Sequence, residues 1–217
     1  MTRLAFLIGR GSRLPNLLER VRAVSGLETV LVLSHKKEAP GLAAARELGV
    51  QAEFFRITDW YREHTGQAAS ELDQDAKNQL RSQYMTTLAR RLTDARIDLV
   101  FMTGWDLVLG PTFFEYFSGA VMNVHPSLLP AFPGEEAWVA ALTYGVKVTG
   151  VTIHFVVDAG IDSGPVILQK AVAIAEDETE DSLRGKLNIA EDEIGPRAIE
   201  LFATGRLEQE GRRVSIS

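Results

Sequence analysis

The sequence predicts an α/β fold with a mostly parallel central sheet and helices on both faces. Short runs rich in Leu, Val, Ile and Phe alternate with segments of helical periodicity through the first half of the chain. These helical segments are long enough to connect neighbouring parallel strands as right-handed βαβ units. In the second half, two longer strand-like runs flank a glycine-containing turn, which predicts an antiparallel strand or two there.

The first half begins with strands and helices in strict alternation. Each expected strand is a short, mainly apolar run, and each expected helix carries its apolar residues on one stripe. In order, these elements are strand Leu4–Ile8, helix Leu14–Val24, strand Thr29–Leu33, helix Gly41–Leu48 and strand Gln51–Phe55. The polar stretch Asp59–Leu80 then breaks the rhythm, and we expect a surface loop or a partly helical insertion there.

The middle of the chain resumes the alternation. A helix is expected at Ser82–Ala95, because apolar side chains recur on one stripe at Tyr84, Leu88, Leu92 and Ala95. The strands expected after it are Leu99–Met102, Ala120–Asn123, Val146–Val157 and Val166–Ile174. The first two are short and apolar, as is typical of central strands buried on both faces.

The last helix is expected to start near Asp177, where Asp177 and Glu180 would form a capping box. The pair Gly195–Pro196 should kink or interrupt this helix, because proline removes a backbone donor and its ring clashes with the preceding turn. The tail Arg206–Ile216 is expected to form a small hairpin. All these elements together predict a Rossmann-like, three-layer fold in a single domain, residues 1–217, since no linker divides the chain.

Composition excludes several classes of protein. The 217 residues carry a net charge of −6, whereas a general nucleic-acid binder presents a basic surface. The chain has no cysteine, so it has no disulfide, no thiolate nucleophile and no cysteine-ligated metal. No apolar run reaches the roughly 18 residues of a membrane span, and no His, Asp and Glu grouping has metal-ligand spacing. We therefore expect a cytosolic protein without metal, nucleic-acid or membrane partners.

The first candidate site is the turn Gly9–Arg13, between the first strand and the first helix. Its glycines allow a tight turn, and free amides at a helix N-terminus can hold a phosphate. Arg10, Ser12 and Arg13 add charge and a hydroxyl donor. The third glycine of a dinucleotide fingerprint is missing, so an ordinary strand-to-helix turn remains the alternative.

The second candidate is the pair Asn123 and His125. Residues two apart on a strand share a face, and this strand ends where open α/β sheets build their binding crevices. An amide donor beside an imidazole can stabilise an oxyanion and move a proton. The pair can equally be structural, with the histidine held by turn carbonyls and the asparagine shaping the turn at Pro126.

The third candidate is the acidic turn Asp158–Pro165. Carboxylates in such turns usually form the turn itself, but a carboxylate at Asp162 brought near His125 would raise the pKa of that imidazole. His154, in the strand pattern that precedes this turn, is more typical of a structural histidine. Glu191 lies at the edge of the last helix's apolar stripe, from which it can reach a bound hydroxyl or amine.

The motif around the second candidate resembles the signature of the 10-formyltetrahydrofolate-dependent formyltransferases. The resemblance is carried by Asn123–Gly134, continues through Gly145–Phe155 and Asp162–Ile167, and extends loosely over Arg3–Val214. It implies formyl transfer from 10-formyltetrahydrofolate, as co-substrate, to the amine of glycinamide ribonucleotide in purine synthesis. It also implies a phosphoribosyl-binding half at about residues 1–100, a folate-binding and catalytic half at about 101–217, and a monomer or homodimer.

By motif position, the resemblance assigns three groups of residues. The catalytic group is Asn123, His125 and Asp162. The substrate-binding group is Gly11, Ser12, Arg13, Asn188, Ile189, Ala190 and Glu191. The folate-binding group is Arg81, Asp106, Leu107, Val108, Leu109, Asn123, Asp158, Ala159, Gly160, Ile161 and Asp162.

The chain also departs from the family's pattern. Ile8 stands where the family has a serine, Arg13 where it has an asparagine, and Asp106–Leu109 where it has a Met-Arg-Ile-Leu type of segment. Glu135–Trp138 replaces a histidine-bearing stretch, and the insertion around Asp59–Leu80 differs. Two alternatives therefore stay open: a folate-dependent transfer to another amine, such as an amino sugar nucleotide, and a folate-binding module without turnover.

Overall fold

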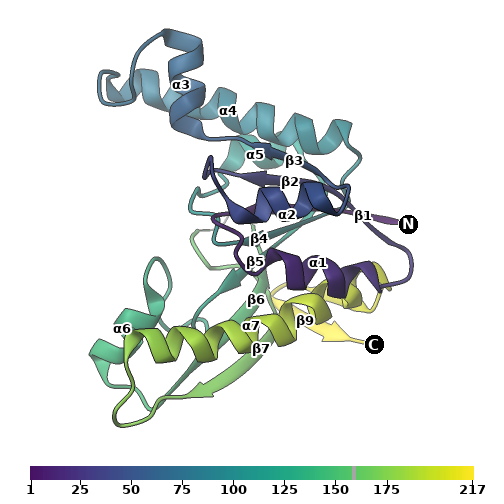
Figure 1. Ribbon diagram of the computed structural model, residues 1–217, viewed down its shortest axis with the longest axis vertical. Coiled ribbons are helices and arrows are strands. Elements are labelled where there is room, and N and C mark those ends of the chain that lie inside the picture. Colours follow the sequence, from purple (N-terminus) through teal and green to yellow (C-terminus); the bar gives the residue numbers. More distant parts are fainter. Residues whose placement is uncertain (158–159) are drawn as a thin grey trace. The chain divides into compact units, whose positions relative to one another are not determined.

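A computed structural model describes residues 1–157 and 160–217. Within these ranges, seven strands form one sheet in the order β3-β2-β1-β4-β5-β6-β7 (Figure 1). They are β1 (Thr2–Ile8), β2 (Leu27–Ser34), β3 (Gln51–Phe54), β4 (Leu99–Thr103), β5 (Ala120–His125), β6 (Val148–Phe155) and β7 (Val166–Ala173). β1 pairs in parallel with β4 and β2 with β3, whereas β6 runs antiparallel to β5 and β7. The predicted fold class is confirmed.

The chain forms two compact units. The N-terminal unit comprises Thr2–Pro15 and Glu28–Ala120, and the C-terminal unit comprises Met1, Asn16–Leu27 and Val121–Ser217. The helices are α1 (Leu14–Arg22), α2 (Pro40–Glu47), α3 (Ile57–Thr65), α4 (Gln74–Asp94), α5 (Pro111–Tyr116), α6 (Ala137–Tyr144) and α7 (Glu180–Ala203). In the described ranges, none of these helices combines the length and apolarity needed to cross a membrane.

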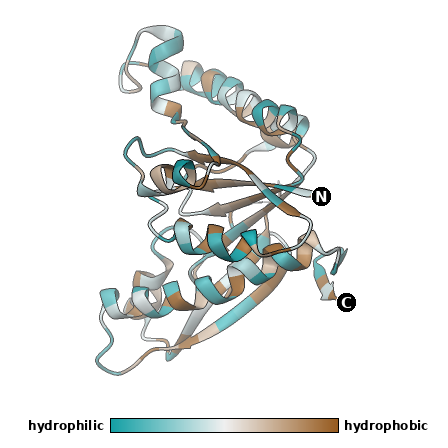
Figure 2. Cartoon of the chain, turned by 45° about the vertical axis from the view of Figure 1, so that its right-hand side comes forward, coloured by the Kyte–Doolittle hydropathy of each residue, from teal (hydrophilic) through white to brown (hydrophobic). Residues whose placement is uncertain are grey.

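The core of the N-terminal unit is built on β1. Every side chain from Leu4 to Ile8 is 0% exposed, as expected for a central parallel strand covered on both faces. The strands of this unit are largely brown in Figure 2, whereas its helices carry teal, hydrophilic residues. On α4 the predicted stripe is buried at Tyr84, Leu88 and Leu92, and the Tyr84 hydroxyl donates to the Phe55 carbonyl at 3.0 Å.

The stretch Asp59–Leu80 is not a surface loop, and its partly helical alternative is correct. α3 and the start of α4 fall within it, and the buried side chains of Tyr61, Leu72 and Leu80 pack together between them. α4 begins at Gln74 rather than at Ser82, because the Asp73 carboxylate caps it by accepting from the amide of Ala76. The helix start at Ser82 was therefore wrong.

In the C-terminal unit, two expectations about α7 were wrong. The helix is capped at Thr179, whose hydroxyl forms a capping box with Ser182, and not at Asp177. It also continues through Pro196 without a break. Pro196 lacks the amide hydrogen that would bond the Asp192 carbonyl; instead, the Arg20 guanidinium donates to that carbonyl. A cation thus replaces the missing helical hydrogen bond.

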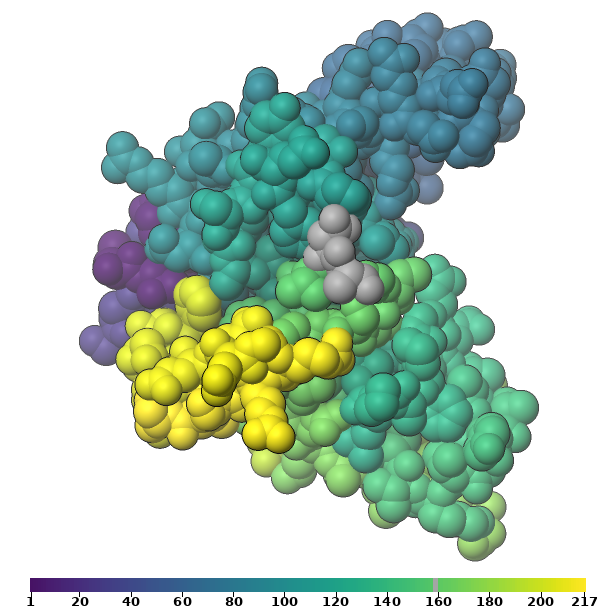
Figure 3. Space-filling model, turned by 180° about the vertical axis from the view of Figure 1, so that it is seen from behind, coloured from purple at the N-terminus to yellow at the C-terminus, as the bar shows by residue number. Residues whose placement is uncertain are grey.

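The two remaining helices were not predicted, whereas the hairpin was. α5 and α6 are short, so few apolar positions repeat and the helical period is hard to detect. The tail forms the predicted hairpin, with β8 (Leu207–Glu210) paired antiparallel to β9 (Arg213–Ile216). This hairpin, yellow in Figure 3, lies on the surface of the C-terminal unit.

Gly11→Ala should lower the free energy of unfolding more than Gly26→Ala does. Both glycines have positive φ, 63° and 77°, so alanine costs about 1–2 kcal/mol at either position. At Gly11 the new Cβ would also lie 2.5 Å from Ile8 Cδ1, whereas at Gly26 no described atom lies within 4 Å. We expect roughly 1–3 kcal/mol of additional loss at Gly11 from overpacking, measured by urea unfolding.

A second change tests the cause of that loss. Ile8→Val removes the Cδ1 atom, so it should recover part of the stability in the Gly11→Ala background. Equal losses at Gly11 and Gly26, or no recovery with Ile8→Val, would contradict this packing.

Candidate active site

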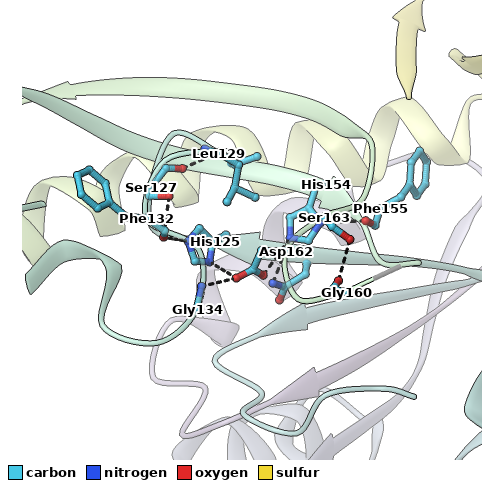
Figure 4. Close-up of polar contacts among 12 residues, drawn as sticks. His125, Ser127, Leu129, Phe132, Gly134, His154, Phe155, Gly160, Asp162 and Ser163 are labelled. Carbon is cyan, nitrogen blue, oxygen red and sulfur yellow. Dashed lines mark hydrogen bonds and ion pairs between the residues drawn. The ribbon is translucent and has the colours of Figure 1, made fainter. Parts of the chain in front are cut away.

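The strand pair β5–β6 places three polar side chains together. In the antiparallel register Asn123 pairs with His154, and His125 pairs with Thr152. Directly paired residues lie on the same face of a sheet, as do residues two apart. Asn123, His125 and His154 therefore share one face, and Figure 4 shows His125 and His154 on either side of Asp162 from the following turn.

His125 is buried and is held at both ring nitrogens. Its Nδ1 atom lies 3.2 Å from Asp162 Oδ2, and its Nε2 atom lies 2.8 Å from the carbonyl oxygen of Phe132. Both neighbours are acceptors, so the doubly protonated ring satisfies both contacts, whereas the neutral ring satisfies one. The geometry around His125 therefore favours the imidazolium, and burial opposes it.

Asp162 receives contacts from three directions. Its Oδ2 atom accepts from the amide of Gly134 at 2.8 Å and faces His125, while its Oδ1 atom lies 3.6 Å from His154 Nε2. The backbone of Asp162 is left-handed, with φ 50°, a conformation that aspartate adopts more readily than most residues. The Asn123 amide nitrogen lies 3.4 Å from the same His154 nitrogen.

Burial sets the protonation of this cluster. Burial lowers the pKa of His125 below 6.5, more than the Phe132 carbonyl and the Asp162 carboxylate raise it. Asp162 raises the pKa of His125, as expected from the sequence, but it does not outweigh the effect of burial. Burial alone would raise the pKa of Asp162, but the nearby His154 ring, the hydrogen bond from the Gly134 amide and the proximity of His125 together lower it. The carboxylate is ionised at neutral pH, and the His125 imidazole is mainly neutral.

The loop after His125 is clamped to β6 and β7. The Thr152 hydroxyl donates to the Ser127 carbonyl at 2.6 Å and accepts from the Leu129 amide at 3.0 Å. Gln169 on β7 donates to the Leu129 carbonyl at 2.9 Å and to the Thr152 hydroxyl at 3.0 Å. These bonds fix the loop whose later residue, Phe132, holds the His125 ring.

The glycine turn of the N-terminal unit is also tightly built. The Gly41 amide donates to the Arg10 carbonyl at 3.1 Å, and the Leu14 amide donates to the Gly11 carbonyl at 3.0 Å. The Ile8 side chain fills the space beneath this turn, in contact range of both Gly11 and Gly41. The turn Gly9–Arg13 is therefore packed against the start of α2.

The described residues contain no group of three or more His, Asp or Glu side chains that could hold a metal ion. The chemistry available at this site is thus that of an amide, two imidazoles and a carboxylate. Such a set can donate hydrogen bonds to an oxyanion and move protons.

Comparison with known proteins shows which family has the same sequence pattern. Residues 2–199 match the formyl transferase family. The chain belongs to that family. The family expected from the motif Asn123–Gly134 is therefore confirmed.

Two named relatives match most of this formyl transferase. The chain is 32% identical over 208 residues to the phosphoribosylglycinamide formyltransferase of Escherichia coli, covering 95% of this chain and 89% of that one. It is 36% identical over 207 residues to the trifunctional purine biosynthetic protein adenosine-3 of Drosophila melanogaster. That match covers 94% of this chain but only 14% of the Drosophila protein, so the chain spans about a seventh of this relative's length.

A solved structure shares the fold along the whole chain. The crystal structure of glycinamide ribonucleotide transformylase 1 from Symbiobacterium toebii is 38% identical, with a TM-score of 0.83. The similarity covers 100% of this chain and 94% of that chain.

The residues that the formyl transferase motif singles out fall into two sets. In the C-terminal unit, Asn123, His125 and Asp162 are brought together, whereas Asp158 and Ala159 lie outside the described residues. Ile161 is 60% exposed, and the Gly160 carbonyl accepts from the Ser163 hydroxyl. The segment Asn188, Ile189, Ala190 and Glu191 lies on α7, with Ala190 buried and Ile189 70% exposed.

In the N-terminal unit, Arg81 contacts the segment Asp106–Leu109. The Arg81 guanidinium donates to the Val108 carbonyl at 2.9 Å, which ties α4 to the loop after β4. Within that loop, Leu109 is buried and Val108 is 49% exposed, so consecutive side chains face different ways.

His154 belongs to the cluster, although the sequence pattern indicated a structural histidine. It was interpreted as structural because an alternating strand pattern does not reveal which residue a neighbouring strand places opposite. Its Nδ1 atom does contact a backbone oxygen, that of Phe155 at 2.9 Å. Its other nitrogen faces Asn123 and Asp162, so His154 joins the site through its pairing with Asn123.

Thr152→Val should destabilise the protein, whereas Thr149→Val should not. Both residues lie on β6 and are buried. Valine at 152 leaves the Leu129 amide and the Ser127 carbonyl without their partner, which costs about 1–3 kcal/mol. The Thr149 hydroxyl has no hydrogen-bond partner among the described residues, so its removal should be neutral or stabilising. Urea unfolding of both variants checks this; similar losses would contradict the clamp.

The pKa of His125 should lie below 6.5 in an NMR titration of the free protein. Asp162→Asn should lower that pKa further, because the neutral amide no longer stabilises the imidazolium. Asp181→Asn, which removes an exposed carboxylate in the first turn of α7, is the control and should leave the titration unchanged. A pKa above 6.5, or no response to Asp162→Asn, would contradict the balance described here.

Proposed function

We propose that this formyl transferase moves the formyl group of 10-formyltetrahydrofolate to the amine of glycinamide ribonucleotide in purine biosynthesis. The observation that carries the proposal is that Asn123 and His125 share one face of β5 and that Asp162, from the turn after β6, lies against His125. The named relatives from Escherichia coli and Drosophila melanogaster support the choice of substrates.

In the reaction, the substrate amine attacks the formyl carbon and negative charge develops on the formyl oxygen. The Asn123 carboxamide and the His125 ring stabilise that oxyanion by donating hydrogen bonds. The amine loses a proton, and the departing folate nitrogen gains one through His125. Asp162 accepts hydrogen bonds in this relay and holds the ring in position, with an ordered water as a further carrier.

The lowered pKa of His125 refines this scheme. The ring enters the reaction mainly neutral, so it can accept a proton from the attacking amine before it donates one. Negative charge developing beside the ring raises its pKa during the reaction. The Asp162 carboxylate, ionised throughout, supports the imidazolium when it forms. The reaction requires no metal.

The two substrates have separate binding residues in this proposal. The phosphoribosyl group is held by Gly11, Ser12, Arg13, Asn188, Ile189, Ala190 and Glu191. The folate is held by Arg81, Asp106, Leu107, Val108, Leu109, Asn123, Asp158, Ala159, Gly160, Ile161 and Asp162. The chain acts as a single domain of residues 1–217 that is cytosolic, monomeric or homodimeric, and without nucleic-acid or membrane partners.

A second candidate keeps the folate and changes the amine. It is favoured by Arg13, which places a guanidinium at the turn where the family pattern has an amide, and by Ile8 beneath that turn. An amino sugar nucleotide is the example considered from the sequence. The choice depends on which amine the turn Gly9–Arg13 accepts.

His125→Ala and Asn123→Ala should each lower turnover with glycinamide ribonucleotide by about two to three orders of magnitude, because each removes an oxyanion donor. Asp162→Asn should do the same by removing the charge that supports the imidazolium. The measurement is the absorbance change on release of tetrahydrofolate. His64→Asn, which alters an exposed histidine on α3, is the matched control and should keep normal turnover.

A panel of amines in the same assay separates the two candidates. Turnover with an amino sugar nucleotide but not with glycinamide ribonucleotide would overturn the first. Folate binding without turnover on any amine would overturn both and support a binding module.

A further inference from the structure

A second polar cluster lies in the N-terminal unit, where β1, β2 and β4 end. Gly9 follows β1, His35 follows β2, and Trp105 and Asp106 follow β4. β2 and β3 lie on one side of β1, and β4 lies on the other, so the strand order reverses at β1. Open parallel sheets bind ligands outside the carboxyl ends of the strands at such a reversal.

The backbone is closely packed at this point. A Cβ atom on Gly9 would lie 2.3 Å from the Gly104 carbonyl oxygen and 3.6 Å from His35 Cε1. The Ser34 hydroxyl donates to the Gly9 carbonyl at 2.7 Å, which joins the ends of β2 and β1. The His35 ring therefore lies directly against the first residue of the glycine turn.

His35 and Trp105 are buried with polar atoms unused. Their rings pack edge to face with centroids 5.2 Å apart, and His35 is 6% exposed. His35 Nε2 lies 3.0 Å from Asp106 Oδ2, but in the described part of the chain neither ring nitrogen, nor Trp105 Nε1, has a partner in hydrogen-bonding geometry. Buried donors without acceptors cost about 1–3 kcal/mol each, and a ligand oxygen would satisfy them.

The charges around His35 are mixed: the Asp106 carboxylate lies 3.0 Å from its Nε2 atom, and the cations Lys36 and Arg56 also act on the ring. Burial lowers the pKa of His35, the Asp106 carboxylate raises it, and the cations Lys36 and Arg56 lower it again, with a net shift below the ordinary value. These groups come from the loops after β2, β3 and β4. The ring is thus mainly neutral at neutral pH in the free protein, and negative charge brought beside it would favour the imidazolium.

We propose that His35 contacts the phosphoribosyl substrate and takes up a proton from solvent when that substrate binds, with Trp105 Nε1 as a second donor. This inference rests on the proposed function for the identity of the substrate. The anionic phosphoribosyl group, rather than the folate, is the ligand because His35 adjoins Gly9 at the start of the glycine turn. Arg56 supplies positive charge for such a group, as does Lys36, whose amine also lies 3.4 Å from Asp106 Oδ2.

Binding calorimetry, repeated in buffers that differ in ionisation enthalpy, measures how many protons are taken up when a ligand binds the protein. We expect the wild-type protein to take up more protons than His35→Asn when glycinamide ribonucleotide or ribose 5-phosphate binds near neutral pH. The affinity of the variant should be roughly tenfold lower on the acidic side, the usual effect of losing a hydrogen bond to a charged group. The phosphate and amine of the ligand titrate with both proteins, so the difference isolates His35.

Three further variants make the result specific. His64→Asn should match the wild type in proton uptake. Trp105→Phe should weaken binding while leaving proton uptake unchanged, because it keeps the ring and removes only Nε1. His35→Gln repeats the test if His35→Asn loses its native circular dichroism spectrum.

The same calorimetric measurement with a folate ligand completes the test. With 5-formyltetrahydrofolate, wild type and His35→Asn should take up equal numbers of protons. Equal proton uptake with both phosphoribosyl ligands in folded variants, or a difference confined to the folate arm, would overturn the proposal. His35-linked binding of ribose 5-phosphate, together with no formyl transfer to glycinamide ribonucleotide, would support this inference and overturn the proposed function.

Discussion

The register between β5 and β6 is the constraint on which the C-terminal unit depends. It places Asn123 opposite His154 and His125 opposite Thr152. Because side chains alternate along a strand, a slip of one residue would turn the whole set to the opposite face of the sheet. The same register brings the Thr152 hydroxyl to the loop that follows His125. A single strand pairing therefore both assembles the polar cluster and holds the loop that orients it.

Burial and polar contacts act in opposite directions on the charges of Asp162 and His125, and the outcome differs between these two residues. Asp162 gains an amide donor from Gly134 and the nearby imidazoles, which outweigh the cost of burying its charge. His125 gains two acceptors, which do not outweigh that cost. The free site thus holds one full negative charge beside a mainly neutral ring. A general acid–base group is most effective when its pKa lies near the working pH. Under the proposed function, a ring whose charge depends on its surroundings suits that role.

The sequence predicts features that depend on residues close together in the chain, and it misses features that depend on contacts between distant residues. The apolar run Leu4–Ile8 and the stripe on α4 depend only on neighbouring residues, and both were found. The start of α4 depends on one cap at Asp73, placed before polar turns that conceal the apolar stripe. In α7, the carbonyl that Pro196 leaves without its helical donor accepts instead from Arg20, far away in the chain. The role of His154 likewise depends on its pairing across strands. Contacts between distant residues leave no pattern in a single sequence.

The departures from the family pattern differ in what they can change. Ile8 is 0% exposed, and its Cδ1 atom fills the space under Gly11 and Gly41, so its replacement of a serine acts on packing and not on charge. Asp106 acts on charge, since it lies beside His35 and Lys36 at the ends of the strands. Arg13 adds a further cation to the turn. Of these, Asp106 and Arg13 thus change the charge near the glycine turn. If the glycine turn holds the amine substrate as proposed, the choice of that substrate should depend on charge and hydrogen bonding in this region, and not on the size of the space under the turn.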